Sequence, residues 1–242
     1  MKNKKLWGVK MNENVGTADM TLDKKEDIVE TVKGVNSIPY RIVKRIFDLL
    51  VSSVGLVFLI PIILMVKILY ICTGDFHSIF LVQKRIGKGG KEFNFFKFRT
   101  MVPDADKVLE KLLKENKELA EEYKENKKLK NDPRITKAGR FIRRYSIDEL
   151  PQILNIFTGK MAMIGNRPYL PREKADMGAY FCSIVSTKPG LTGYWQVSGR
   201  SDVSFLKRLQ LEKYYSEHCC LKLDIKIFFK TFQVVLFGKG AE

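Results

Sequence analysis

The chain has 242 residues, of which 45% are apolar, enough for a hydrophobic core and too many for a disordered basic tail. Its 43 lysines and arginines against 27 acidic residues give a net charge of +16. Nucleic acid, an acidic membrane surface or a phosphorylated small substrate is therefore the expected partner. Four cysteines without a CxxC pair and only two histidines argue against a disulfide framework, a zinc site and histidine-based triads.

The positive charge is concentrated in two parts of the chain. Residues 40–103 carry 10 basic and 3 acidic side chains, and residues 133–242 carry 18 and 9. Residues 1–39 carry 7 basic and 6 acidic side chains, follow no hydrophobic period and lack the apolar core of a secretory signal. We interpret residues 1–39 as a mobile polar leader and expect the two basic regions to face the anion.

An apolar run follows the leader. Between Leu49 and Val66 there is no charged residue, and a straight helix of that length would reach roughly 27 Å against about 30 Å of hydrocarbon. Pro61 lies inside the run, where it removes a backbone donor and clashes with the preceding turn.

Three interpretations of this run compete: a single transmembrane span, a buried core helix, and a re-entrant helix that bends at Pro61 and returns to the same side. The run has no polar face, which argues against a buried core helix. Basic residues precede and follow the run, so both flanks fit the cytoplasmic side and favour the re-entrant helix over residues 40–75.

Two elements are expected after the membrane segment. Aromatic and β-branched runs in residues 76–100 surround a turn at Gly87, Gly89 and Gly90, which predicts a β-hairpin rather than a phosphate-binding loop. Residues 104–130 place apolar side chains at helical spacing among mixed charges, which predicts one amphipathic helix that packs on the body.

The stretch from Asn131 to Glu173 is dense in Arg, Gly and Pro, and we expect the active centre there. Asp148 and Glu149 are adjacent carboxylates, and neighbours on a helix diverge by about 100°, so one can face a substrate and the other a metal. Taken alone, such a pair is more typical of a helix N-terminus. The membrane segment and the arginines favour an anionic-substrate site. These arginines are Arg140, Arg143, Arg144 and Arg167 in this stretch, and Arg200 after it.

The chain closes with an aromatic and basic segment. Ile225, Phe228, Phe229 and Phe232 follow helical spacing, while lysines recur every four residues on another face. Such a helix fits a membrane interface as well as a buried position in its own domain.

Five motifs together resemble the bacterial sugar transferase family, the monotopic phosphoglycosyl transferases that initiate capsule, exopolysaccharide and O-antigen synthesis. The resemblance extends from about residue 38 to the end of the chain. The five motifs read FKFRTM, NDPRIT, SIDELPQILNIFTGKMAMIGNRP, KPGLTGYWQVSGRS and LKLDIKIFFKTFQVVLFGKGA.

The resemblance implies an α+β, mostly helical monotopic membrane protein. It would have a re-entrant helix broken at Pro61, a small β-hairpin, and a cytosolic catalytic domain over residues 76–242 with amphipathic interfacial helices. The implied reaction moves a sugar 1-phosphate from a UDP-sugar to undecaprenyl phosphate and releases UMP, at the cytoplasmic face of the bacterial plasma membrane. The long segment 104–130 is similar to that of members that handle glucose or galactose 1-phosphate.

The resemblance also implies residue roles. Asp148 would be the nucleophile that forms a covalent phosphosugar intermediate, and Asp148 with Glu149 would hold Mg²⁺. Substrate contacts fall on Lys97, Arg99, Arg143, Arg167 and Arg200. The chain departs from the family's GPRP motif, because Asn166 replaces its first proline and removes some rigidity from that loop.

The partners expected from this reading are the UDP-sugar, undecaprenyl phosphate and membrane lipid, without nucleic acid, and a homodimer is compatible with the sequence. The alternative from another class is a membrane-tethered, non-enzymatic binder of nucleic acid or acidic lipid. Its cue is the mixture of aromatic and basic residues in FNFFKFR.

Overall fold

The computed structural model of the chain describes residues 37–126, 129–198 and 203–236. Within these ranges the protein is mostly helical with two small two-stranded sheets, which confirms the expected α+β composition. The elements are α2 (Ile38–Cys72), β1 (Phe80–Ile86), η1 (Lys88–Gly90), β2 (Glu92–Phe98), α3 (Ala105–Glu115), α4 (Lys117–Asn126), α5 (Lys137–Arg144), η2 (Ile147–Glu149), α6 (Gln152–Phe157), β3 (Ala162–Ile164), η3 (Pro171–Glu173), α7 (Lys174–Met177), η4 (Gly178–Tyr180), α8 (Phe181–Val185), β4 (Gly190–Thr192), α9 (Tyr194–Ser198), α10 (Phe205–His218) and α11 (Leu221–Leu236). The predicted leader lies outside the described residues, apart from its last three.

The apolar run lies in one helix of 35 residues, α2. Pro39 stands in its first turn, where a missing N–H is tolerated. At its end the Thr73 hydroxyl donates to the carbonyls of Leu69 and Tyr70 at 3.1 and 3.0 Å. Of the helices in the described ranges, α2 is the one long and apolar enough to cross a membrane.

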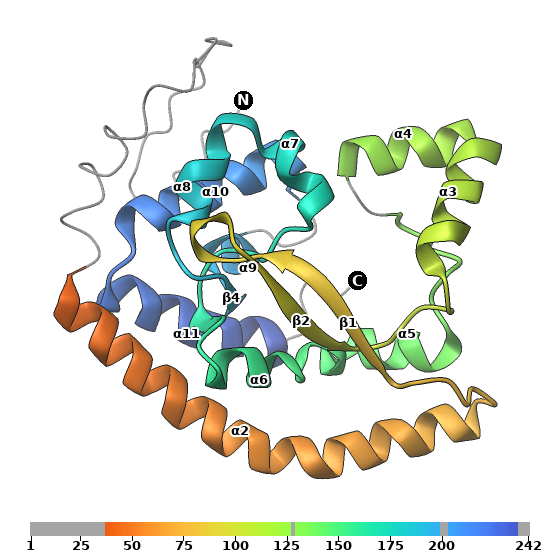
Figure 1. Cartoon of the computed structure of the whole chain (residues 1–242), viewed down its shortest axis with the longest axis horizontal. Helices are drawn as coiled ribbons and strands as arrows, with labels where there is room; N and C mark the ends of the chain where they lie inside the picture. Colours follow the sequence, from red (N-terminus) through yellow and green to blue (C-terminus); the bar gives the residue numbers. More distant parts are fainter. Residues whose placement is uncertain (1–36, 127–128, 199–202, 237–242) are drawn as a thin grey trace.

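Pro61 does not divide α2 into two helices. The helix continues on both sides of Pro61, and Figure 1 shows it bowed along the lower side of the body. An internal proline is a common cause of bending in a long helix. Near the middle of α2, Gly55 allows close approach to α6, because an added Cβ would lie 2.8 Å from the Cδ1 of Ile153.

The predicted hairpin is confirmed. Strands β1 and β2 pair antiparallel, from Phe80 opposite Phe98 to Ile86 opposite Glu92. The turn between them uses positive φ angles of 69° at Gly89 and 77° at Gly90, which glycine adopts without steric cost. Phe93 and Phe95 point to one face of β2 and Phe98 to the other, and each is at most 7% exposed because both faces are covered there.

The single helix expected over residues 104–130 is wrong, since the segment forms α3 and α4. Asn116 separates them in an extended conformation, with φ −131° and ψ 109°. Its side-chain oxygen accepts a hydrogen bond from the Leu119 amide at 3.1 Å and so caps the start of α4. Both helices lie at one end of the molecule, away from α10 and α11 (Figure 1).

The remaining helices surround the short parallel pair β3 and β4, which align Ala162 with Gly190 and Ile164 with Thr192. One buried cluster joins β3, α9, α10 and α11 through Ile164, Trp195, Tyr215 and Ile227. This cluster buries one face of α11, while Leu221, Ile225, Phe229 and Phe232 of the same helix stay exposed. The terminal helix therefore combines the two arrangements that the sequence allowed.

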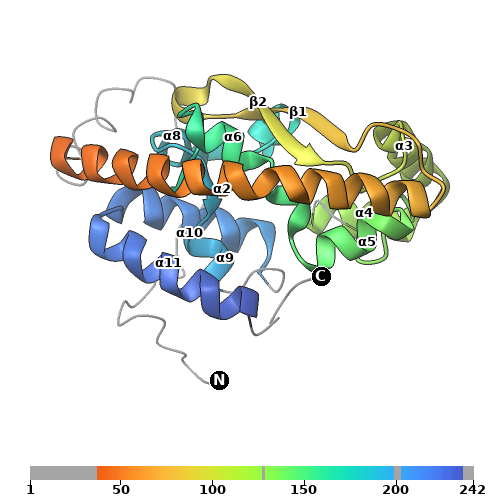
Figure 2. The same ribbon diagram turned by 90° about the horizontal axis from the view of Figure 1, so that it is seen from below.

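Exposed apolar side chains gather on the elements around α2. In the view from below, α2 crosses the face of the molecule with α6 on one side and α11 on the other (Figure 2). We call the exposed apolar side chains of α2, α5, α6 and α11 the apolar face; its members include Leu50, Val54, Phe58, Leu64, Ile68, Phe141, Leu154, Phe157, Ile225, Phe229 and Phe232.

Candidate active site

The two adjacent carboxylates lie in the short helix η2. Asp148 is 7% exposed, and Glu149 is partly exposed. Ser146, directly before η2, has φ 54° and ψ 23°, a left-handed conformation that is uncommon for a residue other than glycine. Backbone strain of this kind concentrates at functional sites.

Lys97 of β2 joins the two carboxylates. Its Nζ lies 3.0 Å from Asp148 Oδ2 and 3.0 Å from Glu149 Oε1. The Lys97 side chain is 23% exposed, so its charge compensates two acids that burial would otherwise penalise. The structure thus brings together three of the predicted site residues, Lys97, Asp148 and Glu149.

The carboxylates lie directly against the membrane helix candidate. Ile147 and Leu150, the residues on either side of the pair, pack against the buried cluster that contains Val66 and Tyr70 of α2. The backbone on either side of the pair is therefore anchored to α2.

Glu149 of the pair also lines a pocket that is open to solvent. The pocket is lined by Arg85, Phe95, Lys97, Glu149, Gln152, Arg167, Pro168, Gly190, Leu191 and Gln196. Its charged lining residues are three cations and one carboxylate, which suits a ligand that carries negative charge.

The GNRP loop forms one wall of this pocket. The amide of Arg167 donates to Oε1 of Glu212 on α10 at 2.9 Å. Asn166 is 3% exposed, and its Nδ2 donates to Ser216 Oγ at 2.6 Å and to the carbonyl of Ile184 at 3.1 Å. These hydrogen bonds anchor the loop to α8 and α10 at the position where the family motif has a proline.

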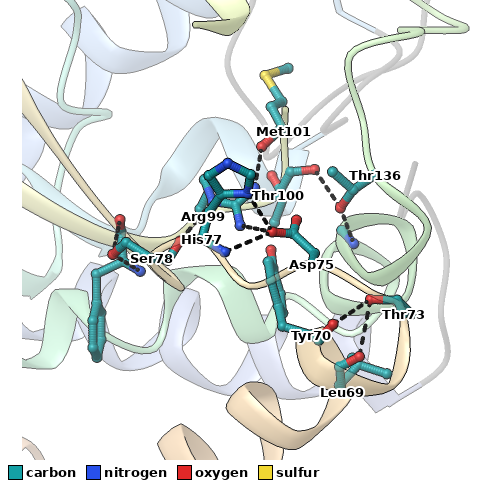
Figure 3. A network of polar contacts seen from close by, with 12 residues as sticks. Leu69, Tyr70, Thr73, Asp75, His77, Ser78, Arg99, Thr100, Met101 and Thr136 are labelled. Atoms are coloured by element: carbon teal, nitrogen blue, oxygen red, sulfur yellow. Dashed lines mark hydrogen bonds and ion pairs between the residues drawn. The ribbon is translucent and has the colours of Figure 1, made fainter. Parts of the chain in front are cut away.

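Arg99 is occupied by the protein itself. Figure 3 shows its guanidinium bonded to Asp75 Oδ1 at 2.9 Å, the Ser78 carbonyl at 2.7 Å and the Met101 carbonyl at 3.0 Å. It also lies over the Tyr70 ring at 4.9 Å. Arg99 thus fastens the end of α2 to the end of β2 and does not line the pocket, and its predicted substrate contact has no support in this geometry.

The other two predicted arginines differ in what the structure describes. Arg143, on the exposed side of α5, donates from Nε to Thr100 Oγ1 at 2.9 Å and does not line the pocket. Its substrate contact stays a prediction. Arg200 lies outside the described residues.

Comparison with known proteins assigns the chain to a family. The family model for bacterial sugar transferases matches residues 39–238. The chain belongs to the bacterial sugar transferase family. Over 200 residues it is 40% identical to the exopolysaccharide production protein ExoY of Rhizobium meliloti, a match that covers 82% of this chain and 87% of the relative.

Two longer relatives carry names that describe an activity. The undecaprenyl-phosphate galactose phosphotransferase of Salmonella typhimurium is 42% identical over 83% of this chain and 42% of its own length. The galactosyl transferase CpsE of Streptococcus agalactiae is 35% identical over 95% of this chain and 52% of its own length. As a member of this family, the chain is a transferase enzyme.

Two carboxylates form a limited donor set for a metal in this sugar transferase. Within the described residues, no group of three or more His, Cys, Asp or Glu side chains is arranged to hold one. Mg²⁺ is commonly bound by one or two carboxylates, with water and substrate phosphates as the remaining ligands. Asp148 and Glu149 fit that requirement, and Lys97 Nζ shows that a cation can contact both.

Sequence reasoning missed four residues of the transferase site: Arg85, Gln152, Gln196 and Glu212. Arg85 was visible only as one basic residue among several, although it occupies an inward position of β1. Gln152 stands four residues after Asp148, about one helical turn, which is the signal that could have identified it.

Proposed function

We propose that this sugar transferase moves galactose or glucose 1-phosphate from a UDP-hexose to undecaprenyl phosphate and releases UMP, as the first membrane step of polysaccharide assembly. The observation that carries the proposal is that Asp148 and Glu149 share the Lys97 ammonium, while Glu149 lines the cationic pocket and the residues on either side of the pair pack against the buried cluster of α2. A lipid phosphate and a nucleotide diphosphate can reach one carboxylate from these two sides.

In the first step, an oxygen of the Asp148 carboxylate attacks the β-phosphorus of the donor. The bond from that phosphorus to the bridging oxygen breaks, and UMP leaves with the electron pair. Lys97 orients the carboxylate and lies beside the reacting phosphoryl group, where a fixed positive charge stabilises the transition state.

In the second step, a phosphate oxygen of undecaprenyl phosphate attacks the same phosphorus. The acyl phosphate bond breaks, the Asp148 carboxylate is restored, and the lipid carries a diphosphate-linked sugar. Glu149, hydrogen-bonded to Lys97, is placed to keep the lysine oriented through both displacements.

Asp148 and Glu149 are proposed to hold Mg²⁺ together with the donor phosphates. When bound, the ion would neutralise phosphate charge and so let a carboxylate approach phosphorus.

The proposed topology is monotopic, with both ends of α2 at the cytoplasmic face of the plasma membrane. Its support is the bow of α2 (Figure 1) and the exposed apolar side chains that α2, α6 and α11 all carry. Single cysteines at Val43 and Gly87, in a background without native cysteines, should both be shielded from an impermeant periplasmic reagent. Labelling at one of them alone would establish a true span.

The substitution Pro61→Leu sharpens the same experiment. Leucine restores the backbone donor and removes the ring clash, so the variant should shift towards a straight, spanning helix and expose one cysteine to the reagent. Labelling identical to that of the parent would mean that Pro61 does not determine the topology.

The decisive test of the reaction is isotope exchange. Labelled UMP should enter UDP-hexose without undecaprenyl phosphate in the wild type, because the first displacement is reversible. Asp148→Asn should abolish exchange and transfer, while the surface variant Asp176→Asn should retain both. Absence of exchange in the wild type, with transfer intact, would replace the covalent mechanism by direct displacement.

Sugar identity is addressed by a panel of UDP-sugars in a UMP-release assay. The names of the Salmonella and Streptococcus relatives refer to galactose or a galactosyl group. A third relative, from Komagataeibacter xylinus, is named an undecaprenyl-phosphate glucose phosphotransferase and is 32% identical over 82% of this chain. UDP-galactose or UDP-glucose should give the fastest release. The non-enzymatic binder is disfavoured because Phe93, Phe95 and Phe98 of FNFFKFR are buried and offer no surface for base stacking.

A further inference from the structure

The pocket beside the carboxylates contains N–H groups that the protein leaves without partners. Arg85 Nε, Gln152 Nε2 and Arg167 Nε are each buried and make no hydrogen bond within the described part of the chain. All three residues line the same pocket. Leaving one buried donor unpaired is costly, so three in one pocket indicate a ligand that accepts hydrogen bonds.

Arg85 is held firmly in place by the rest of the protein. It is 8% exposed, its Nη1 donates to the Pro168 carbonyl at 3.0 Å, and its Nη2 donates to Gln83 Oε1 at 2.8 Å. These bonds fix the plane of the guanidinium and connect β1 to the GNRP loop. The Nε group is the part left available to a ligand.

Gln152 lines the pocket together with Glu149. It is 2% exposed and begins α6, one helical turn after Asp148. A buried amide with an unpaired N–H beside Glu149 can donate to an anionic oxygen without adding charge to the site.

The local charge balance also favours an anion. Arg167 and Arg172 repel Arg85, and Arg167 also repels Arg208. The acids that attract Arg85 are Glu173 and Glu149, and those that attract Arg208 are Glu212 and Glu173. Burial, and then the charge of Arg167, lowers the pKa of Arg85 from 12.5 to about 9. A bound phosphate would relieve both penalties.

We infer that Arg85 and Gln152 bind phosphate oxygens of the donor nucleotide, with Gln152 at the phosphate nearest Asp148 and Arg85 at the phosphate that leaves. This inference rests on the proposed function and adds two substrate-binding residues to it. It places the leaving group between the hairpin and the GNRP loop, on the side of the carboxylates away from α2.

The test is direct binding by the full chain in detergent micelles, with UDP, inorganic pyrophosphate and uridine as probes at fixed Mg²⁺. Arg85→Met and Gln152→Met should each raise the Kd for UDP and for pyrophosphate about tenfold or more, since each removes a buried donor to an anion. The weaker binding of uridine should not change. Matched controls are Arg172→Met, from a surface ion pair, and Gln210→Met on α10, which should bind like the wild type.

The outcomes separate this inference from the proposed function. Unchanged UDP binding in both variants, or an equal loss for uridine, would overturn the phosphate assignment even if the wild type transfers sugar phosphate. A wild type that binds UDP but releases no UMP from any UDP-sugar would overturn the proposed function instead. If circular dichroism shows that Arg85→Met does not fold, Arg85→Lys and Gln152→Met test the phosphate assignment in its place. Lysine keeps the positive charge but loses the planar guanidinium, so Arg85→Lys should bind pyrophosphate more weakly than the wild type but still measurably.

Discussion

The apolar face and the cationic pocket depart from an ordinary soluble surface in opposite ways. On α2 and α11, large apolar side chains such as Phe58 and Phe229 stay 63% and 65% exposed. In the pocket, Arg85 and Gln152 are buried with unpaired N–H groups. The first arrangement is stable in hydrocarbon and the second beside an anion. Under the proposed function, lipid would cover the apolar face and the phosphates of the donor would bind in the cationic pocket. Asp148 would act where these two regions meet.

A largely buried ion pair joins α2 and α11. Asp224 of α11, 4% exposed, accepts from Lys44 of α2, from Tyr40 of α2 at 2.8 Å and from Tyr215 of α10 at 2.8 Å. This cluster sets the depth of α11 relative to α2, although the residues are about 180 positions apart in the chain.

The largest expected effect follows from breaking that cluster. Asp224→Asn leaves the Lys44 ammonium buried without a counter-charge, so the free energy of unfolding should fall by about 3–5 kcal/mol. Denaturant titration in detergent measures it. The double variant Lys44→Met with Asp224→Asn should recover part of the loss, and a single variant as stable as the wild type would show that the pair does not hold the two helices.

The next effect concerns Lys97, which contacts both carboxylates. Lys97→Met keeps the length of the side chain but removes the charge from the two carboxylates, so kcat should fall about hundredfold or more. Lys84→Met, on the exposed side of β1, is the matched control and should retain activity. Comparable rates for both variants would mean that Lys97 is not part of the catalytic site.

Local patterns predicted the hairpin and the amphipathic character of α11, because glycine turns and helical periodicity act within a few residues. The motif resemblance pointed to Asp148, Glu149 and Lys97, and the structure shows Lys97 in contact with both carboxylates. The break at Asn116 was missed because a capping side chain competed with helix propensity. The engagement of Arg99 by Asp75 and the burial of Arg85 depend on contacts between segments distant in sequence, which periodicity does not contain.

A smaller effect is expected when the apolar face is made polar. Phe229 and Phe232 are 65% and 52% exposed, so the double substitution to Ser should weaken the membrane contact of α11 by about 2 kcal/mol. A nitroxide at Ile225 should become more accessible to an aqueous relaxation agent in vesicles. The control variant Thr231→Ser changes a side chain that contacts Thr192 in the body, so the accessibility of the nitroxide should not change. Equal nitroxide accessibility in the wild type, the double variant and this control would mean that α11 does not contact the membrane.

The last effect is the smallest per pH unit, and it tests the other half of the comparison, where charge is buried. Burial raises the pKa of Glu212 from 4.5 to about 7. Between these values the folded protein keeps a proton that the unfolded chain has released, so the Glu212 contribution makes stability fall as pH rises, by at most about 1.4 kcal/mol per pH unit. Glu212→Gln stays neutral and can still accept the Arg167 amide bond, so this slope should vanish. Thermal unfolding in detergent should give similar Tm values for both proteins at pH 4.5 and a growing advantage for the variant up to pH 7. If Glu212 is instead ionised in the folded state and stabilised by Arg208, the variant will be the less stable protein at pH 7, and the loop that carries Arg167 will depend on that charge.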